Sequence, residues 1–100
     1  MAARRLVLPM DQIQALCRRY HVSELSLFGS AARKDFNATS DLDLLVEFEP
    51  GTHVGFLSLA RMQRELADIV GRPVDLVPKQ GLKPLIRQAV LASAEVLYEA

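Results

Sequence analysis

The sequence has little cysteine, no net charge and no long apolar run, and each shortage narrows the class of protein. The single cysteine, Cys17, excludes an internal disulfide framework. The 12 basic and 12 acidic side chains cancel, so no long-range field favours a nucleic-acid substrate. No apolar stretch approaches the roughly 18 residues of a membrane span, and residues 6–8 are too short for a secretory signal. Together these absences predict a cytoplasmic protein.

A chain of 100 residues predicts one domain, spanning residues 1–100, with one modest core. Apolar residues recur at helical spacing, and short apolar runs between turn residues predict strands. The expected helices are 10–21, 54–70 and 82–92, and the expected strands are 25–28, 41–48 and 74–77, with 96–98 as a strand or a packed extension. This order predicts an α/β (α+β) fold, a small mixed sheet of three to four strands flanked by helices. The loop between the first two strands is too short for a crossover helix, which favours a pair that is antiparallel or only loosely connected and leaves the strand order open.

Two aspartates, Asp41 and Asp43, stand on one face of the second expected strand. Side chains alternate along a strand, so both project away from the core-facing leucines between and beyond them. Like charges on one strand face repel each other, and a divalent cation would reverse that cost because it prefers carboxylate oxygens. Taken alone, the pair is also compatible with a strand face exposed to solvent. Glu47 on the same face favours this alternative, because it resembles an ordinary charged surface residue.

A third carboxylate, Asp75, interrupts the apolar strand 74–77. If this strand lies beside the second strand, Asp75 joins Asp41 and Asp43 in one acidic pocket. Three carboxylates can hold two Mg²⁺ ions about 4 Å apart for in-line phosphoryl transfer. An edge-strand surface position is the alternative for Asp75.

Gly29 and Ser30 follow the first strand directly. Glycine lets a phosphate approach the backbone, and exposed N–H groups at a turn attract anions. The same dipeptide also fits an ordinary turn with a helix N-cap. Arg33 suits either a phosphate contact or a structural salt bridge.

The motifs together resemble a known family. Gly29-Ser30, ten intervening residues and Asp41-Leu42-Asp43 are similar to the signature of the polymerase-β-like nucleotidyltransferase superfamily. The run from Phe28 to Arg33 and the strand that holds Asp75 resemble its minimal branch, the MNT or MntA-like antitoxins. The resemblance spans residues 8–98. Lys34 stands where relatives often have glycine. This difference affects the expected geometry of the turn and leaves the expected role of the carboxylates unchanged.

The resemblance implies Mg²⁺-dependent transfer of a nucleotide from an NTP, with AMP from ATP expected. It implies that Gly29 and Ser30 hold the triphosphate, that Asp41 and Asp43 ligate Mg²⁺, and that Asp75 completes the site. The implied acceptor is a tyrosine of a HEPN-domain toxin, which makes the chain an antitoxin. A non-catalytic binding module and a small-molecule nucleotidyltransferase are the alternatives, and either a homo- or a hetero-oligomer is compatible with the sequence.

Overall fold

The computed structural model describes residues 8–28 and 41–100. In chain order these residues form α1 (Met10–Arg19), β1 (Val22–Phe28), β2 (Leu42–Phe48), α2 (Phe56–Val70), β3 (Val74–Pro78), the short 3₁₀ helix η2 (Lys79–Gly81), α3 (Pro84–Ser93) and β4 (Glu95–Glu99). Each helix and strand expected from the sequence is present in this part of the chain, with ends shifted by a few residues. Residues 96–98, expected as a strand or a packed extension, belong to the strand β4.

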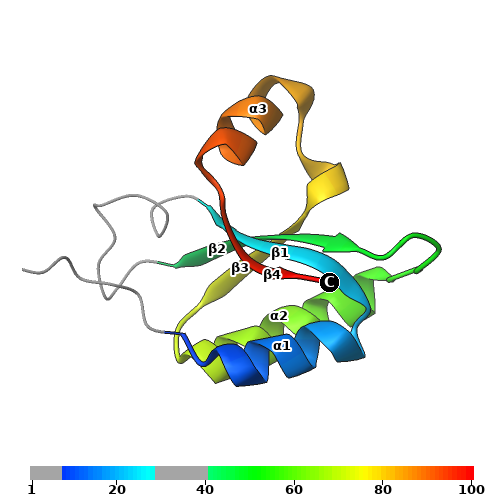
Figure 1. The fold of residues 1–100 in the computed structure, drawn as a ribbon, viewed down its shortest axis with the longest axis vertical. Helices are drawn as coiled ribbons and strands as arrows, with labels where there is room; N and C mark the ends of the chain where they lie inside the picture. Colours follow the sequence, from blue (N-terminus) through cyan, green and yellow to red (C-terminus); the bar gives the residue numbers. More distant parts are fainter. Residues whose placement is uncertain (1–7, 29–40) are drawn as a thin grey trace, which may run out of the picture.

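The four strands form one mixed sheet in the order β3-β2-β1-β4. β1 runs antiparallel to both β2 and β4, and β3 runs parallel to β2. The expected antiparallel pairing of the first two strands is therefore confirmed. The α/β (α+β) prediction is confirmed too, because helices flank a mixed sheet of four strands (Figure 1).

One face of the sheet carries the core. α1 and α2 lie together against this face, as Figure 1 shows. Alternate residues of β1 and β2 meet the buried stripes of the two helices. The most deeply buried side chains are Ile13, Leu16, Cys17, Val22, Leu25, Leu42, Leu44, Val46, Met62 and Leu66. Every second residue of these strands and every third or fourth residue of these helices therefore face the same core layer.

The two core-covering helices are joined at the surface by a polar contact. The Tyr20 hydroxyl donates a hydrogen bond to the Glu65 carboxylate, which also pairs with the Arg19 guanidinium. That guanidinium lies 5.6 Å from the centre of the Tyr20 ring.

The opposite face of the sheet is buried at its centre and only half-buried at the two ends of β2, at Asp43 and Glu47. α3 lies on this side of the sheet, where it contacts β1 (Figure 1). Leu45 and Ser26, which are paired across β2 and β1, are only 3% and 4% exposed. Within residues 8–28 and 41–100, no helix combines the length and apolarity needed to cross a membrane.

Candidate active site

The start of β2 is fixed in place by the core and by the neighbouring strand. Leu42 and Leu44 are buried against the helices, which turns Asp43 toward the opposite face. The Leu42 backbone N–H donates to the Pro73 carbonyl at 2.9 Å, which ties the start of β2 to the start of β3. The position of Asp43 is thus set by backbone pairing and by packing on both sides of it.

β3 brings the third carboxylate to the same place. Asp43 and Asp75 are register partners on parallel neighbouring strands, so their side chains share a face about 5 Å apart at the backbone. On the other side of β3, the Leu76 N–H donates to the Gln63 side-chain oxygen of α2 at 2.8 Å. This bond occupies a backbone donor of an edge strand and holds β3 in register.

The three aspartates influence one another electrostatically. Asp43 is half-buried, whereas Asp41 and Asp75 are exposed. Burial raises the pKa of the Asp43 carboxyl, and the neighbouring charges of Asp75 and Asp41 raise this pKa further. The structure therefore places Asp75 beside Asp43 on a neighbouring strand, and Asp41 near enough for its charge to act on Asp43.

The metal role assigned to these residues stays a prediction. Across residues 8–28 and 41–100, no three carboxylate, imidazole or thiol groups lie close enough to surround one ion. Gly29, Ser30 and Arg33 lie outside the described residues, so their expected phosphate contacts stay predictions as well.

A second polar cluster lies farther along the same face, at the other end of β2. The Lys79 ammonium pairs with Glu47 at 3.3 Å and with Glu24 at 3.4 Å. These carboxylates raise the Lys79 pKa, although burial alone would lower it. Sequence reasoning treated Glu47 as plain surface charge and overlooked Lys79, because the pairing depends on η2 folding back over the strands.

The fold and these carboxylates define a class of protein, a small mixed-sheet domain with acidic side chains where two parallel strands begin. Residues 10–97 match the family model of the nucleotidyltransferase domain. The chain belongs to this family and is a nucleotidyltransferase.

Named relatives agree with this assignment. The chain is similar to protein adenylyltransferase MntA of Thermococcus cleftensis, with 37% identity over 83 residues, which cover 83% of this chain and 80% of the relative. An inferred protein adenylyltransferase of Methanocaldococcus jannaschii is 37% identical over 76 residues, covering 76% and 80% of the two chains. The solved structure of an inferred minimal nucleotidyltransferase matches with a TM-score of 0.71 and 39% identity over 85% of each chain.

Two more distant structures share the fold. A toxin–antitoxin crystal structure with AMP-PNP gives a TM-score of 0.77 at 22% identity, covering 93% of this chain and 75% of that one. A complex of tri-AMPylated Shewanella oneidensis HEPN toxin with MNT antitoxin gives a TM-score of 0.67 at 20% identity, with 91% and 70% coverage. At these identities the likeness concerns the fold alone.

Proposed function

We propose that this chain transfers AMP from ATP to a hydroxyl group of a protein, namely a tyrosine of a HEPN-domain toxin. In this role it is the antitoxin of a toxin–antitoxin pair and acts in the cytoplasm, where ATP is available. The name of the Thermococcus relative supports AMP transfer to a protein. The HEPN complex of a fold neighbour supports the choice of acceptor, and the AMP-PNP complex supports an adenine nucleotide as donor.

The observation that carries the proposal is the register of Asp43 with Asp75 across two parallel strands. Without a cationic partner this arrangement is unfavourable, since both neighbouring charges oppose ionisation of Asp43. A fold that holds repelling carboxylates in register is typical of a site that receives a cation with its substrate. A solvated strand face would have no need of this alignment.

The donor set fits Mg²⁺. Carboxylate oxygens are its preferred protein ligands, and Mg²⁺ is usually held by one or two carboxylates together with substrate phosphates and water. Asp41 and Asp43 would hold the ion that accompanies the triphosphate, and Asp75 would complete a site for up to two ions. When bound, Mg²⁺ would neutralise charge on the triphosphate and make the attacking hydroxyl more acidic.

The residues of the chain itself bind, orient and move a proton. Asp75 is exposed beside Asp43 and would accept the proton of the attacking tyrosine. The phenolic oxygen then bonds to the α-phosphorus of ATP, the bond from that phosphorus to the bridging oxygen breaks, and pyrophosphate leaves. The backbone N–H groups at Gly29 and the Ser30 hydroxyl would hold the triphosphate, with Arg33 beside it. Positioning and charge stabilisation supply most of the rate in such a site.

Substitution of single carboxylates tests the proposal. In Asp43→Asn and Asp75→Asn, transfer of α-labelled phosphate from ATP to the HEPN-domain protein of the same locus should fall at least about a hundredfold, the scale for loss of one charge-stabilising group. Asp68→Asn, which makes the same change at an exposed position of α2, should leave transfer unchanged. Label in gel-separated toxin and the intact mass of the toxin measure the result.

The outcomes separate the competing functions. Full transfer by Asp43→Asn would refute the catalytic role. If Asp43→Asn transfers nothing but still silences the toxin, the chain neutralises by contact. Transfer of label only to a soluble small molecule would indicate a small-molecule nucleotidyltransferase.

A further inference from the structure

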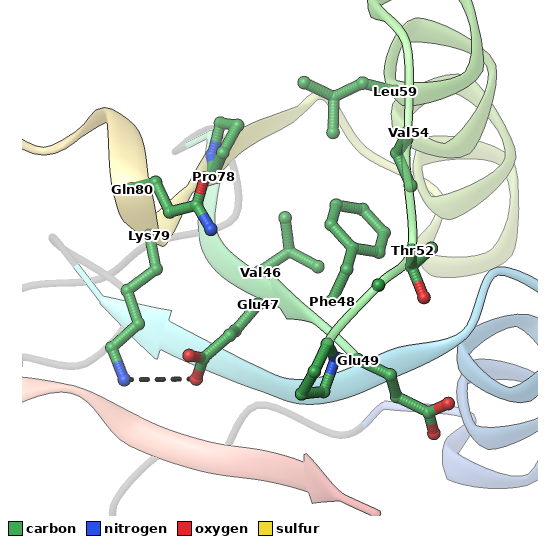
Figure 2. Close-up of a pocket in the computed structure, with 12 residues that line it drawn as sticks. Val46, Glu47, Phe48, Glu49, Thr52, Val54, Leu59, Pro78, Lys79 and Gln80 are labelled. Carbon is green, nitrogen blue, oxygen red and sulfur yellow. Dashed lines mark hydrogen bonds and ion pairs between the residues drawn. The ribbon is translucent and has the colours of Figure 1, made fainter.

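A pocket of about 220 Å³ opens at the end of the sheet opposite the aspartates. Figure 2 shows apolar side chains of β2 and the loop before α2 facing across it, with Pro78 and Gln80 closing one side. Its apolar lining consists of Val46, Phe48, Val54, Leu59 and Pro78. This volume suits one or two inserted side chains and is below the roughly 300 Å³ of a usual small-molecule site.

Two large apolar side chains stand exposed in the segment that lines the pocket. Phe56 and Leu57 are 82% and 78% exposed, and they lie between the lining residues Val54 and Leu59. They begin α2, and its buried stripe starts farther along with Met62. Neighbouring aromatic and aliphatic residues left in water beside an apolar pocket are typical of a protein interaction surface.

The charge around the pocket is negative. Glu47 and Glu49 line it, and Glu24 lies next to Glu47 across the sheet. Lys79 is the cation that lines it, and this ammonium is already paired with both Glu24 and Glu47. Three carboxylates against one ammonium leave two net negative charges, which favour a partner with basic side chains.

The pocket and the aspartates are connected through β2. Glu47 and Asp43 lie on the same face of this strand, four residues apart, which corresponds to about 13 Å along the backbone. Val46 and Phe48 point to the helix-covered face of the strand, so a folded protein reaches both places by covering the end of β2 at Glu47 and continuing along the opposite face to Asp43 and Asp75. A free amino acid is too small to span this distance.

We propose that the pocket, together with Phe56 and Leu57, is the docking surface for the acceptor protein. The acceptor inserts an apolar side chain that is flanked by lysine or arginine. Docking there positions the acceptor hydroxyl at the aspartates and sets which protein is modified. This inference rests on the proposed function for the identity of the acceptor, and the experiment below keeps the two separate.

Binding is measured by calorimetry between the HEPN-domain protein and this chain in the Asp43→Asn background, so that no transfer alters either partner. Adding Phe56→Ser with Leu57→Ser should weaken binding about tenfold or more, the loss expected for central apolar contacts. The matched control replaces two exposed apolar residues elsewhere, Leu91→Ser with Val96→Ser, and should bind as before. Circular dichroism checks that each variant is folded.

A second arm tests the charge. Glu49→Lys should weaken binding, and the loss should shrink as salt is raised. Asp68→Lys, which reverses a charge on the exposed face of α2, is its control. With Asp43 restored, the serine pair should raise KM for the toxin and leave kcat unchanged.

The outcomes of the two proposals differ. Toxin binding that is equally strong in the serine pair and in its control overturns the docking surface, whether or not AMP is transferred. If toxin binding depends on Phe56 and Leu57 but the unaltered chain transfers no AMP, the proposed function is overturned and the docking surface is retained. Equal weakening by both serine pairs points to a general apolar effect and also overturns the docking surface.

Discussion

Asp43 differs from its two neighbours because it alone of the three aspartates is half-buried. Leu42 and Leu44 anchor its backbone in the core, so the side chain cannot move away from Asp75 without cost. The exposed Asp41 and Asp75 have more freedom to adjust to a ligand. We therefore expect the Asp43 side chain to move least of the three when a ligand binds.

Cys17 gives a prediction at the scale of one residue. Its thiol is fully buried in the core, and burial raises its pKa from 9.0 to about 11. Because the folded state favours the protonated thiol, this contribution to the free energy of unfolding is complete below pH 9. It is lost as the pH rises from 9 to about 11, and two pKa units correspond to about 3 kcal/mol.

Comparison with Cys17→Ala isolates this effect from other titrating groups. At pH 8 the alanine variant should be less stable by about 1–2 kcal/mol, because a buried side chain is shortened. The difference between the two proteins should shrink or reverse by pH 10.5. Urea unfolding followed by circular dichroism measures both values, and a difference that is constant between these pH values would contradict the buried thiol.

At the scale of elements, the ends of the two core helices show how the chain is redirected into strands. α2 is capped after Val70 by Gly71, whose φ of 75° is left-handed and whose N–H donates to the Ala67 carbonyl at 2.8 Å. The chain after α1 also turns through a left-handed residue, His21, with a φ of 60°. The helix expected over residues 10–21 included His21, whereas α1 ends at Arg19 and the backbone of His21 is left-handed.

Gly71→Ala should lower the free energy of unfolding by about 1 kcal/mol, the cost of a left-handed backbone for a residue with Cβ. No atom lies within 4 Å of the added Cβ, so backbone strain alone is measured. Gly81→Ala is the control, since its added Cβ also meets nothing and its φ is not positive. Equal stability of the two variants in chemical denaturation would show that the left-handed cap contributes nothing.

At the scale of the whole molecule, ligand binding should be visible in the melting temperature. Mg²⁺ with a non-hydrolysable ATP analogue binds only the folded state, so saturation should raise the Tm by at least about 4 °C for a domain of this size. Asp43→Asn should lose most of this rise, and Asp68→Asn should keep it. Differential scanning calorimetry with and without EDTA provides the measurement, and an identical rise in both variants would exclude Asp43 from the site.

Local patterns in the sequence were enough to predict the helices and strands and the chemical groups that they carry. Local periodicity and turn residues predicted helices and strands, because strand alternation, helical stripes and residues such as Gly71 and Pro84 act within a few positions. The spacing from Gly29-Ser30 to Asp41 and Asp43 indicated the family, which the comparisons confirm. The part of this motif at Gly29, Ser30 and Arg33 stays a prediction.

Which strands are neighbours depends on how the whole chain packs. The order β3-β2-β1-β4 aligns Asp75 with Asp43, and η2 brings Lys79 to Glu47. These contacts join residues about thirty positions apart, so they depend on how whole elements bury their apolar faces and not on local preference. The pocket beside Phe56 and Leu57 arises in the same way, from a strand end, a loop and a 3₁₀ helix that meet only after the sheet has formed.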